Sequence, residues 1–488
     1  MWIALDIGSS QWKAGAFTAD GREQAVARIP IPLSRERSGY QTVRADAVFP
    51  ALCGLLNALP ESARRSACGL AVTGMAEGGL LLHAGSHRPA SALLPWFDSR
   101  ATGLFERLRG EGRLTGRFPV TGLPDSPKYN VYKLLALLQE TGLSPHGALF
   151  LGAPEFAAFL LTASLATEAT LAARTHAFDI VSLAWDEGFL RSLGLPASVF
   201  PPVKPGGLAM GALTAQVARN TGLPEGLPVA LCGHDHLCAA YGARAVEENS
   251  LYCSAGTAQV LLKPLPGHAL DAGDQATGLS FGPAPGGGLC ALGAIQSAGL
   301  SLNLLNSLLF PGEEGFAALL SEADGFQPAQ GGLLYFPYLA GSGPPRMLAG
   351  ARGAFIGLDA DTTRAQLLHA VYQGLAFESR VILDAAGGGA SRLLVAGGLS
   401  AHPGYLRALA DTLALEVVVP SCREGTLLGA ARLMASRAGQ DFSPLPPGAS
   451  LKPDARRVEA LDRVYRRHYL PLRQAQLDFY EGLKTEGP

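Results

Sequence analysis

The chain has 488 residues, of which 48% are hydrophobic, and a formal net charge of −2. This length exceeds what one ordinary hydrophobic core supports, so we expect two large domains or three smaller ones. Because the charge is nearly neutral and no run of Lys and Arg occurs, nucleic acid is not expected as a partner.

The cysteine pattern and the apolar segments predict a cytoplasmic protein without membrane contact. Seven cysteines occur singly, with no Cys-x-x-Cys pair, which favours reduced thiols over a disulfide framework. The N-terminus has no basic region and reaches Asp6 at once, so no signal peptide is expected. The longest apolar segment, 156–167, lies between Glu155 and Glu168 and is too short to span a bilayer.

The first elements predicted along the chain are three consecutive strands, over 2–7, 14–19 and 24–31. The turn Gly8-Ser9-Ser10 lies between the first two strands. A tight turn of small residues exposes backbone N–H groups that can hold a phosphate, and Lys13 is close enough to add positive charge. An ordinary β-turn is the alternative interpretation of the same residues.

Two further strands, over 70–73 and 80–83, are separated by a turn that contains Glu77. They precede the stretch Pro95-Trp96-Phe97-Asp98-Ser99-Arg100, where an aromatic pair is followed by an acid and a base. Such a stretch suits a small polyhydroxylated ligand, because aromatic faces stack on C–H groups while polar groups bind hydroxyls. A half-buried loop is the alternative. An amphipathic helix is predicted next, over 132–140.

The stretch His234-Asp235-His236 places one carboxylate between two imidazoles. It follows an apolar run over 227–231 that predicts a buried strand, and it precedes a small-residue helix over 238–243. A carboxylate at a strand end, held by a Gly-containing turn, can face a cleft, which suits Asp235 to the role of a general base. An exposed Asp in a turn, or a metal site of two His and one Asp, are the alternatives.

An internal repeat links the two halves of the chain. Residues 251–262 repeat the plan of residues 4–17, namely a strand, a small-residue turn (here Gly256-Thr257) and another strand. Two such hairpins predict a duplicated α/β domain whose phosphate-binding turns face one cleft. Asp235 falls just before the second half begins, at the expected hinge.

The second half also contains a strand over 392–396 that runs into Gly397-Gly398, ahead of a helix over 404–413. Glycines at a strand end let a flat ligand approach the backbone, so an adenine site is expected there, with a ligand-free tight turn as the alternative. The other elements expected are loops with a short hairpin over 264–289, a helix over 363–384 with Leu367, Val371 and Leu375 on one stripe, a strand over 417–419, a small-residue helix from 424 to 431, a linker over 439–453, and a polar helix over 456–483 kinked at Pro471.

The order of these motifs resembles one family, the FGGY carbohydrate kinases, over nearly the whole chain. The most specific match is Gly353-Ala354-Phe355-Ile356-Gly357-Leu358, followed after seven residues by 366–373, which is similar to the family's C-terminal signature. The supporting matches are Asp6 to Ser10 with Lys13, Gly233 to Asp235, Gly256-Thr257, Gly397-Gly398 and Gly429 to Ala431.

The resemblance implies an α/β fold of two ribonuclease-H-like domains, of the actin and sugar-kinase type, with a cleft between them. The N-terminal domain, 1–244, is then expected to bind the sugar and to supply the first phosphate loop and the catalytic Asp235. The C-terminal domain, 245–488, is expected to supply the second phosphate turn and the adenosine pocket.

The resemblance also implies roles for individual residues, with ATP and Mg²⁺ as cofactors. Asp235 matches the general base, and Asp6 matches an acid near the Mg²⁺. The phosphates are expected to contact Gly8, Ser9, Ser10, Lys13, Gly256 and Thr257. The adenosine is expected to contact Gly397 and Gly398. The sugar is expected to contact Glu77, Trp96, Asp98 and Asp235.

The expected activity is transfer of the γ-phosphoryl group of ATP to a hydroxyl of a small sugar or polyol, first of all a ketopentose such as xylulose or ribulose. The Gln-x-His typical of xylulokinases is replaced here by Gly74-Met75-Ala76-Glu77, and only an acid stands where glycerol kinases have Arg-Glu. The alternatives are polyols of the glycerol or erythritol type, gluconate, or a non-catalytic actin-like nucleotide-dependent sugar sensor. A homodimer is common among such relatives and is a further expectation.

Overall fold

The computed structural model describes residues 1–246, 249–309, 332–443 and 448–485. Contacts group the chain into two compact units. The first unit comprises Met1–Arg244, Phe281–Leu289 and Glu424–Leu445, and the second comprises Ala245–Ser280, Cys290–Arg423 and Pro446–Pro488. Among the described residues, no helix combines the length and the apolar character that crossing a membrane requires.

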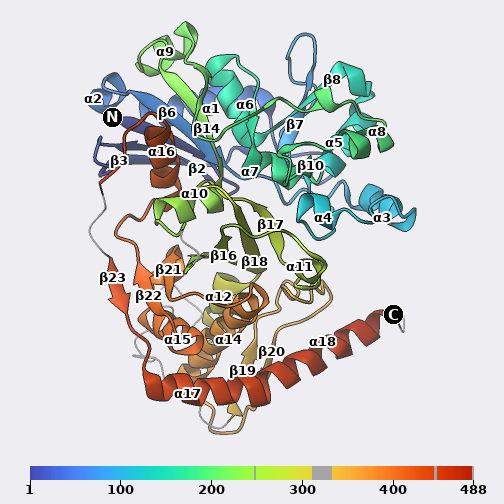
Figure 1. Ribbon diagram of the computed structural model, residues 1–488, viewed down its shortest axis with the longest axis vertical. Helices are drawn as coiled ribbons and strands as arrows, with labels where there is room; N and C mark the ends of the chain where they lie inside the picture. The colour runs from blue at the N-terminus through green and yellow to red at the C-terminus, as the bar shows by residue number, and fades with distance from the viewer. Residues whose placement is uncertain (247–248, 310–331, 444–447, 486–488) are drawn as a thin grey trace. The chain divides into compact units, whose positions relative to one another are not determined.

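The first unit is built on a six-stranded sheet in the order β13-β14-β6-β1-β2-β3 (Figure 1). Strand β1 pairs antiparallel with β2 and parallel with β6, and β6 pairs parallel with β14. The carboxyl ends of β1, β6 and β14 therefore meet at one edge of the sheet. The strands are β1 (Trp2–Ile7), β2 (Gln11–Phe17), β3 (Glu23–Pro30), β6 (Gly69–Gly74), β13 (Ala209–Ala212) and β14 (Pro228–His234).

Helices cover this sheet, so the apolar side chains of its central strands are buried. Helices α1 (Ala45–Asn57) and α6 (Ala153–Thr162) contact it from the N-terminal half of the chain. Helix α16 (Gly425–Arg437) returns from far along the chain to pack on β1, β2 and β6, and it lies beside α10 (Asp235–Gly242) (Figure 1). The two small-residue helices predicted separately from the sequence are therefore packed against each other.

A long insertion between β6 and β13 forms a second core within the first unit. Strand β7 (Gly79–His83) pairs antiparallel with β8 (Ala148–Gly152) outside the main sheet. The buried side chains of α3 (Thr102–Gly110) and α5 (Asn130–Thr141), among them Phe105 and Tyr132, pack in an apolar cluster of their own. Helix α5 confirms the amphipathic helix expected over 132–140.

The second unit repeats the strand order of the first, which confirms the internal repeat. Strand β15 pairs antiparallel with β16 and parallel with β21, as β1 pairs with β2 and β6. Strand β22 then follows parallel to β21, and β23 antiparallel to β22. The strands, in the order β18-β16-β15-β21-β22-β23, are β18 (Leu289–Ile295), β16 (Gln259–Leu265), β15 (Ser250–Ala255), β21 (Arg392–Ala396), β22 (Glu416–Val419) and β23 (Ala449–Leu451).

Helix α14 (Arg364–Ala385) begins at Thr363, whose side chain forms a reciprocal capping box with Gln366. The helix expected over 363–384 is confirmed, and its burial extends beyond the stripe of Leu367, Val371 and Leu375 to nearly every residue from Leu368 to Leu383. Helices α12 (Ala298–Leu309) and α15 (Pro403–Leu413) and strand β19 (Leu334–Phe336) all contact it, so the helix is surrounded rather than half-exposed.

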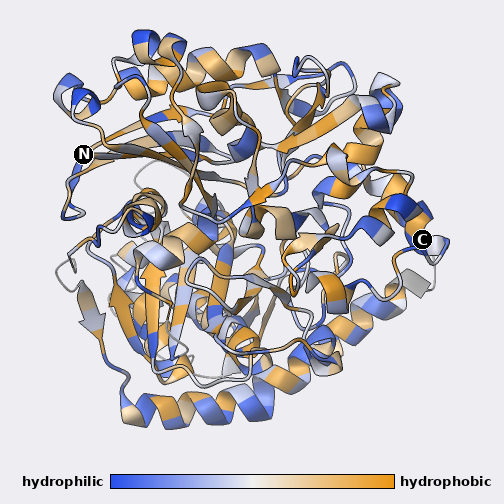
Figure 2. Cartoon of the chain, turned by 45° about the horizontal axis from the view of Figure 1, so that its top comes forward, coloured by the Kyte–Doolittle hydropathy of each residue, from blue (hydrophilic) through white to orange (hydrophobic). Residues whose placement is uncertain are grey.

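Three other expectations for this unit need correction. Residues 439–453 are not only a linker, because β23 adds a sheet strand there, while 444–447 lie outside the described residues. The stretch 264–289 holds a short helix, α11 (Ala272–Ala276), besides strand β17 (Ser280–Pro283). The irregularity expected at Pro471 is a π-helical turn, Tyr465–Tyr469, between α17 (Ala455–Val464) and α18 (Leu470–Thr485). Figure 2 shows hydrophilic and hydrophobic residues alternating along the long helical segment that α17, the π-helical turn and α18 form.

Candidate functional site

The carboxyl edge of β1, β6 and β14 holds two of the acidic side chains singled out from the sequence, Asp6 and Asp235. Asp6 lies near the end of β1, opposite Thr73 of β6 and Lys13 of β2. Asp235 is the first residue of α10 and directly follows the last residue of β14. No turn separates strand and helix, so the Gly-containing turn expected before Asp235 is wrong: Gly233 lies within β14, at an irregularity in its register.

Two buried threonine hydroxyls hold the junction between β14 and α10. The Thr73 hydroxyl donates to the Gly233 carbonyl, and the Thr170 hydroxyl accepts the His234 N–H at 2.9 Å. Gly233 has φ +116°, and a β-carbon there would stand 2.5 Å from the Thr170 hydroxyl, so glycine is required on both counts. Sequence reasoning missed both threonines, because a buried threonine in an apolar run carries no signal of its long-range partner.

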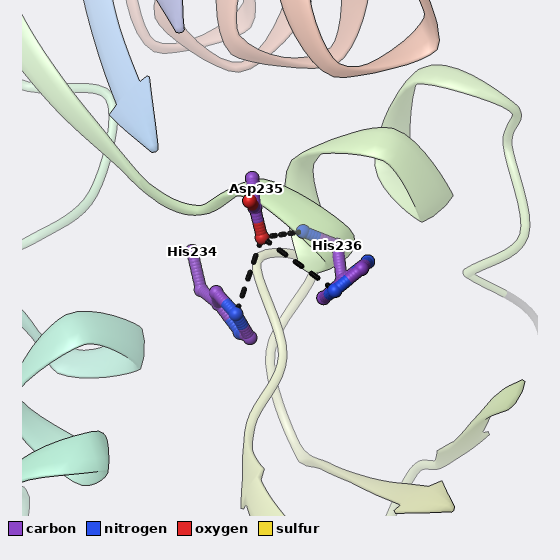
Figure 3. A group of neighbouring side chains, drawn as sticks. All are labelled: His234, Asp235 and His236. Atoms are coloured by element: carbon purple, nitrogen blue, oxygen red, sulfur yellow. Dashed lines mark hydrogen bonds and ion pairs between the residues drawn. The ribbon is translucent and has the colours of Figure 1, made fainter. Parts of the chain in front are cut away.

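Asp235 is oriented by its neighbours in the chain (Figure 3). Its Oδ1 accepts the backbone N–H of His236 at 2.6 Å and lies 3.2 Å from His234 Nε2. Burial lowers the pKa of His234 to about 4, although the Asp235 charge opposes this, so the imidazole is neutral near pH 7. The Asp235 side chain remains 25% exposed at the start of a helix, where the helix dipole favours a negative charge.

Asp6 is nearly buried and is poor in partners. Its Oδ1 has no hydrogen bond to any described residue. Burial, with the neighbouring Asp235 carboxylate adding to it, raises the pKa of Asp6 to about 8. A buried carboxylate oxygen without a donor, close to a second carboxylate, is an arrangement that a divalent cation stabilises.

The predicted phosphate turn, Gly8-Ser9-Ser10, joins β1 to β2 as expected. A β-carbon at Gly8 would stand 2.8 Å from the Gln11 carbonyl oxygen, so the turn needs glycine there. Lys13 is not free: its Nζ lies 3.1 Å from Glu424 Oε2, and Arg28 binds the other oxygen of the same carboxylate at 2.6 Å. No local pattern indicates that Glu424, 411 residues after Lys13 in the chain, belongs to this cluster.

Glu77 is held by two cations that sequence reasoning missed. Arg174 donates to Glu77 Oε1 at 2.6 Å, and Lys128 Nζ lies 3.4 Å from the same oxygen. Burial works to raise the pKa of Glu77, but the charges of Arg174 and Lys128 outweigh it together and hold the pKa well below its usual value. Tyr129 lies under both cations, 5.5 Å from each to its ring centroid.

The loop with Trp96 and Asp98 is anchored by Lys133, which is fully buried in α5. The Lys133 ammonium donates to the backbone carbonyls of Glu77, Pro95 and Trp96, which satisfies its three protons. Trp96 is 42% exposed. The Asp98 carboxylate is buried in an ion pair with Arg100 at 2.9 Å, so its geometry shows a loop anchor, and its contact with a sugar stays a prediction.

In the second unit, the structure brings the other predicted nucleotide residues together. The Gly256-Thr257 turn follows β15, and Gly397-Gly398 follow β21, which is the parallel neighbour of β15. Gly397 has φ +97°, and a β-carbon there would stand 2.5 Å from the Ala255 carbonyl oxygen. The N–H of Gly299 donates to the Gly256 carbonyl at 3.0 Å, so this turn contacts the first turn of α12.

Comparison with known proteins identifies the fold class of this architecture. The solved gluconate kinase from Lactobacillus acidophilus superimposes with a TM-score of 0.89 over 99% of each chain, at 19% identity. The two repeated α/β units are therefore those of the actin and sugar-kinase fold, as expected.

The family follows from the sequence. The model for the N-terminal domain of the FGGY family of carbohydrate kinases matches residues 1–242, and the model for its C-terminal domain matches 251–438. The chain is 30% identical to the glycerol kinase of Thermus brockianus (95% of this chain, 97% of the other) and 27% identical to the xylulose kinase of Bacillus subtilis strain 168 (90% and 88%). The chain belongs to the FGGY family of carbohydrate kinases. It is a phosphotransferase that uses ATP with Mg²⁺.

Proposed function

We propose that this chain transfers the γ-phosphoryl group of ATP to a hydroxyl of a small sugar or polyol, with a ketopentose such as xylulose or ribulose as the first acceptor. The observation that carries the proposal is the pair of carboxylates, Asp6 and Asp235, at the carboxyl ends of two strands of one sheet. In this proposal residues 1–244 bind the acceptor and supply the base, and residues 245–488 bind the adenosine.

Asp235 is the general base of the proposed reaction. Its Oδ1 is occupied by the His236 N–H, while its Oδ2 accepts no hydrogen bond from the part of the chain that the structure describes. That second oxygen receives the proton of the acceptor hydroxyl as the bond to phosphorus forms. Because phosphoryl transfer has a loose transition state, most of the catalysis comes from orienting this hydroxyl and from balancing charge.

Asp6 fits the role of a Mg²⁺ ligand, directly or through water, because it offers a buried carboxylate oxygen without a protein donor. When bound, Mg²⁺ neutralises charge on the phosphate oxygens. Lys13 adds positive charge beside the Gly8-Ser9-Ser10 turn, and the Gly256-Thr257 turn of the second unit offers backbone N–H groups to the phosphates. Gly397 and Gly398 leave room for the adenosine.

The acceptor contacts proposed are Glu77, Trp96 and Asp98, together with Asp235. Glu77 stays ionised beside Arg174 and Lys128, and such charged groups bind sugar hydroxyls strongly. A xylulose kinase, 27% identical, is among the relatives and supports a ketopentose, whereas a glycerol kinase, 30% identical, is a reason to include polyols in the test.

The test is ADP release from Mg·ATP across a panel of ketoses, polyols and aldonates. One acceptor should be strongly preferred, and Asp235→Ala should lower its turnover by about 10²–10⁴-fold, the usual contribution of a general base. Calorimetric ATP binding should stay within about twofold, because the nucleotide contacts are elsewhere. Asp46→Ala, which removes an exposed carboxylate from the first turn of α1, is the matched control.

Turnover that survives in Asp235→Ala would refute the role of this residue. If no acceptor of the panel causes ADP release although ATP still binds, the result would instead favour the nucleotide-dependent sugar sensor.

A further inference from the structure

The residues around the proposed base form a compact set of nitrogen and oxygen ligands. His234, Asp235 and His236 each offer one ligand atom, and these atoms lie within 4.8 Å of one another (Figure 3). His234 Nε2 stands 3.2 Å from Asp235 Oδ1, and His236 Nε2 stands 4.0 Å from the same oxygen. The two rings are 5.3 Å apart at an angle of 87°, one on each side of the carboxylate.

We propose that His234, Asp235 and His236 form a binding site for a divalent transition metal of the Zn²⁺ type, and that an ion there inhibits the kinase. Two imidazoles and one carboxylate are a ligand set that Zn²⁺ accepts, with water in the fourth position. Mg²⁺ prefers oxygen ligands only, so the metal that accompanies ATP does not compete effectively for this set.

Two of the three ligand distances already lie near those that such an ion requires. Zn–N and Zn–O bonds of about 2.0–2.2 Å place tetrahedral ligand atoms roughly 3.3–3.5 Å apart. The His234–Asp235 pair already has this spacing at 3.2 Å, and the His236–Asp235 pair at 4.0 Å must close slightly. The His236 side chain is 35% exposed, so it can rotate without disturbing the core.

The imidazole of His234 is nearly buried, and its Nε2 faces the Asp235 carboxylate. The residue is only 6% exposed, and its Nδ1 makes no hydrogen bond to any described residue. Asp235 is 25% exposed, which leaves the ion a path from solvent.

An ion on Asp235 Oδ1 withdraws charge from the whole carboxylate and lowers its basicity, so the acceptor hydroxyl loses its proton acceptor. This inhibition rests on the proposed function of Asp235, whereas the binding of the metal does not. The two parts can therefore fail separately.

Direct binding is measured first, on the full chain without nucleotide or Mg²⁺, by competition for ZnCl2 with a chromogenic chelator. His236→Asn should weaken Zn²⁺ binding at least tenfold, because it removes one ligand and leaves the others. The control is His146→Asn, which changes an exposed histidine of the same unit and should bind Zn²⁺ as the parent does. All seven cysteines are present in each protein, so any thiol binding is a shared background.

Co²⁺ provides a spectroscopic check, because a low-symmetry cobalt site with imidazole ligands has strong visible d–d absorption. The band should be present in the parent and in His146→Asn and lost in His236→Asn. Equal Zn²⁺ affinity in the parent and His236→Asn, or a cobalt band that survives this substitution, would overturn the site.

Inhibition is measured next, at saturating Mg·ATP and acceptor, as the Zn²⁺ concentration that halves turnover. This concentration should rise at least tenfold in His236→Asn relative to the parent and His146→Asn. Zn²⁺ that binds at the site without lowering turnover would support the metal site and refute the role of Asp235 as base.

Discussion

At the scale of single residues, the pKa of each buried carboxyl group in this chain depends on the charges and donors beside it. Glu77 has two cations against it and stays ionised, whereas Asp6 has a second carboxylate nearby and its pKa rises to about 8. Glu155 is a third case: the Thr167 hydroxyl donates to its Oε1 at 2.8 Å, while its Oε2 has no hydrogen bond to any described residue. Burial raises the pKa of Glu155 to about 7, and Glu168 nearby adds to the rise.

Glu155 should therefore make stability depend on pH. Because the folded protein holds this proton more tightly than the unfolded chain does, its contribution favours folding below pH 4.5 and is lost as the pH rises through about 7. The loss is about 3 kcal/mol, by the linkage of pKa to free energy. Glu155→Gln keeps an acceptor for Thr167 and cannot ionise, so its free energy of unfolding should exceed that of the parent by about this amount at pH 8 and match it near pH 4.5.

Urea unfolding of both proteins at several pH values measures this difference. A difference that does not change with pH would show that Glu155 does not titrate in this range.

At the scale of elements, the backbones of α10 and α16 approach each other closely. A β-carbon at Gly429 would overlap the carbonyl oxygen of Cys238, and one at Gly242 would overlap the carbonyl oxygen of Gly425. Both helices therefore need small residues where they meet. The proposed base begins α10, so a shift of α16 would reach Asp235 through this contact.

Gly429→Ala should lower the free energy of unfolding by about 1–3 kcal/mol or more, because the added methyl has no space. Gly54→Ala is the matched control: Gly54 also lies inside a helix, α1, but nothing stands within 4 Å of a β-carbon there. That change should stabilise by up to about 1 kcal/mol, through helix propensity alone. Thermal and urea unfolding measure the stability of both variants. An equal loss of stability in Gly429→Ala and Gly54→Ala would contradict the proposed lack of space between α10 and α16.

At the scale of the whole molecule, the first unit depends on residues from both ends of the chain. The side chains of Leu427 and Met434 in α16 lie against Gly15 of β2 and Gly69 of β6. Burying each large apolar side chain contributes about 1.5–3 kcal/mol, so several of them together approach the total stability of a typical domain.

A fragment of residues 1–244 should consequently be unstable by itself. It lacks α16, so one face of its sheet loses its cover, and it should bind an apolar dye and unfold without cooperativity. Joining residues 424–443 to it through a flexible Gly/Ser linker should restore a cooperative thermal transition. A fragment that melts cooperatively without this addition would show that α16 is dispensable for the first unit.

The sequence by itself determined many of the elements and part of the candidate site. Strands such as β1 and β21 were predicted to within a residue, because apolar runs bounded by glycine turns are local signals. The repeated hairpin and the ordered motifs led to the right family and fold. They also selected Asp6 and Asp235, which the parallel strands β1, β6 and β14 bring to one edge.

Only the tertiary structure decided which distant groups meet. Glu424 binds Lys13, Arg174 binds Glu77, and Lys133 anchors three carbonyls of the site loops, and none of these pairs has a sequence signature. Likewise α14 has the periodicity of a helix, but its burial on all sides depends on neighbours from before and after it in the chain. The physical reason is common to all: hydrophobic periodicity reports local conformation, whereas charge pairing and burial depend on long-range packing.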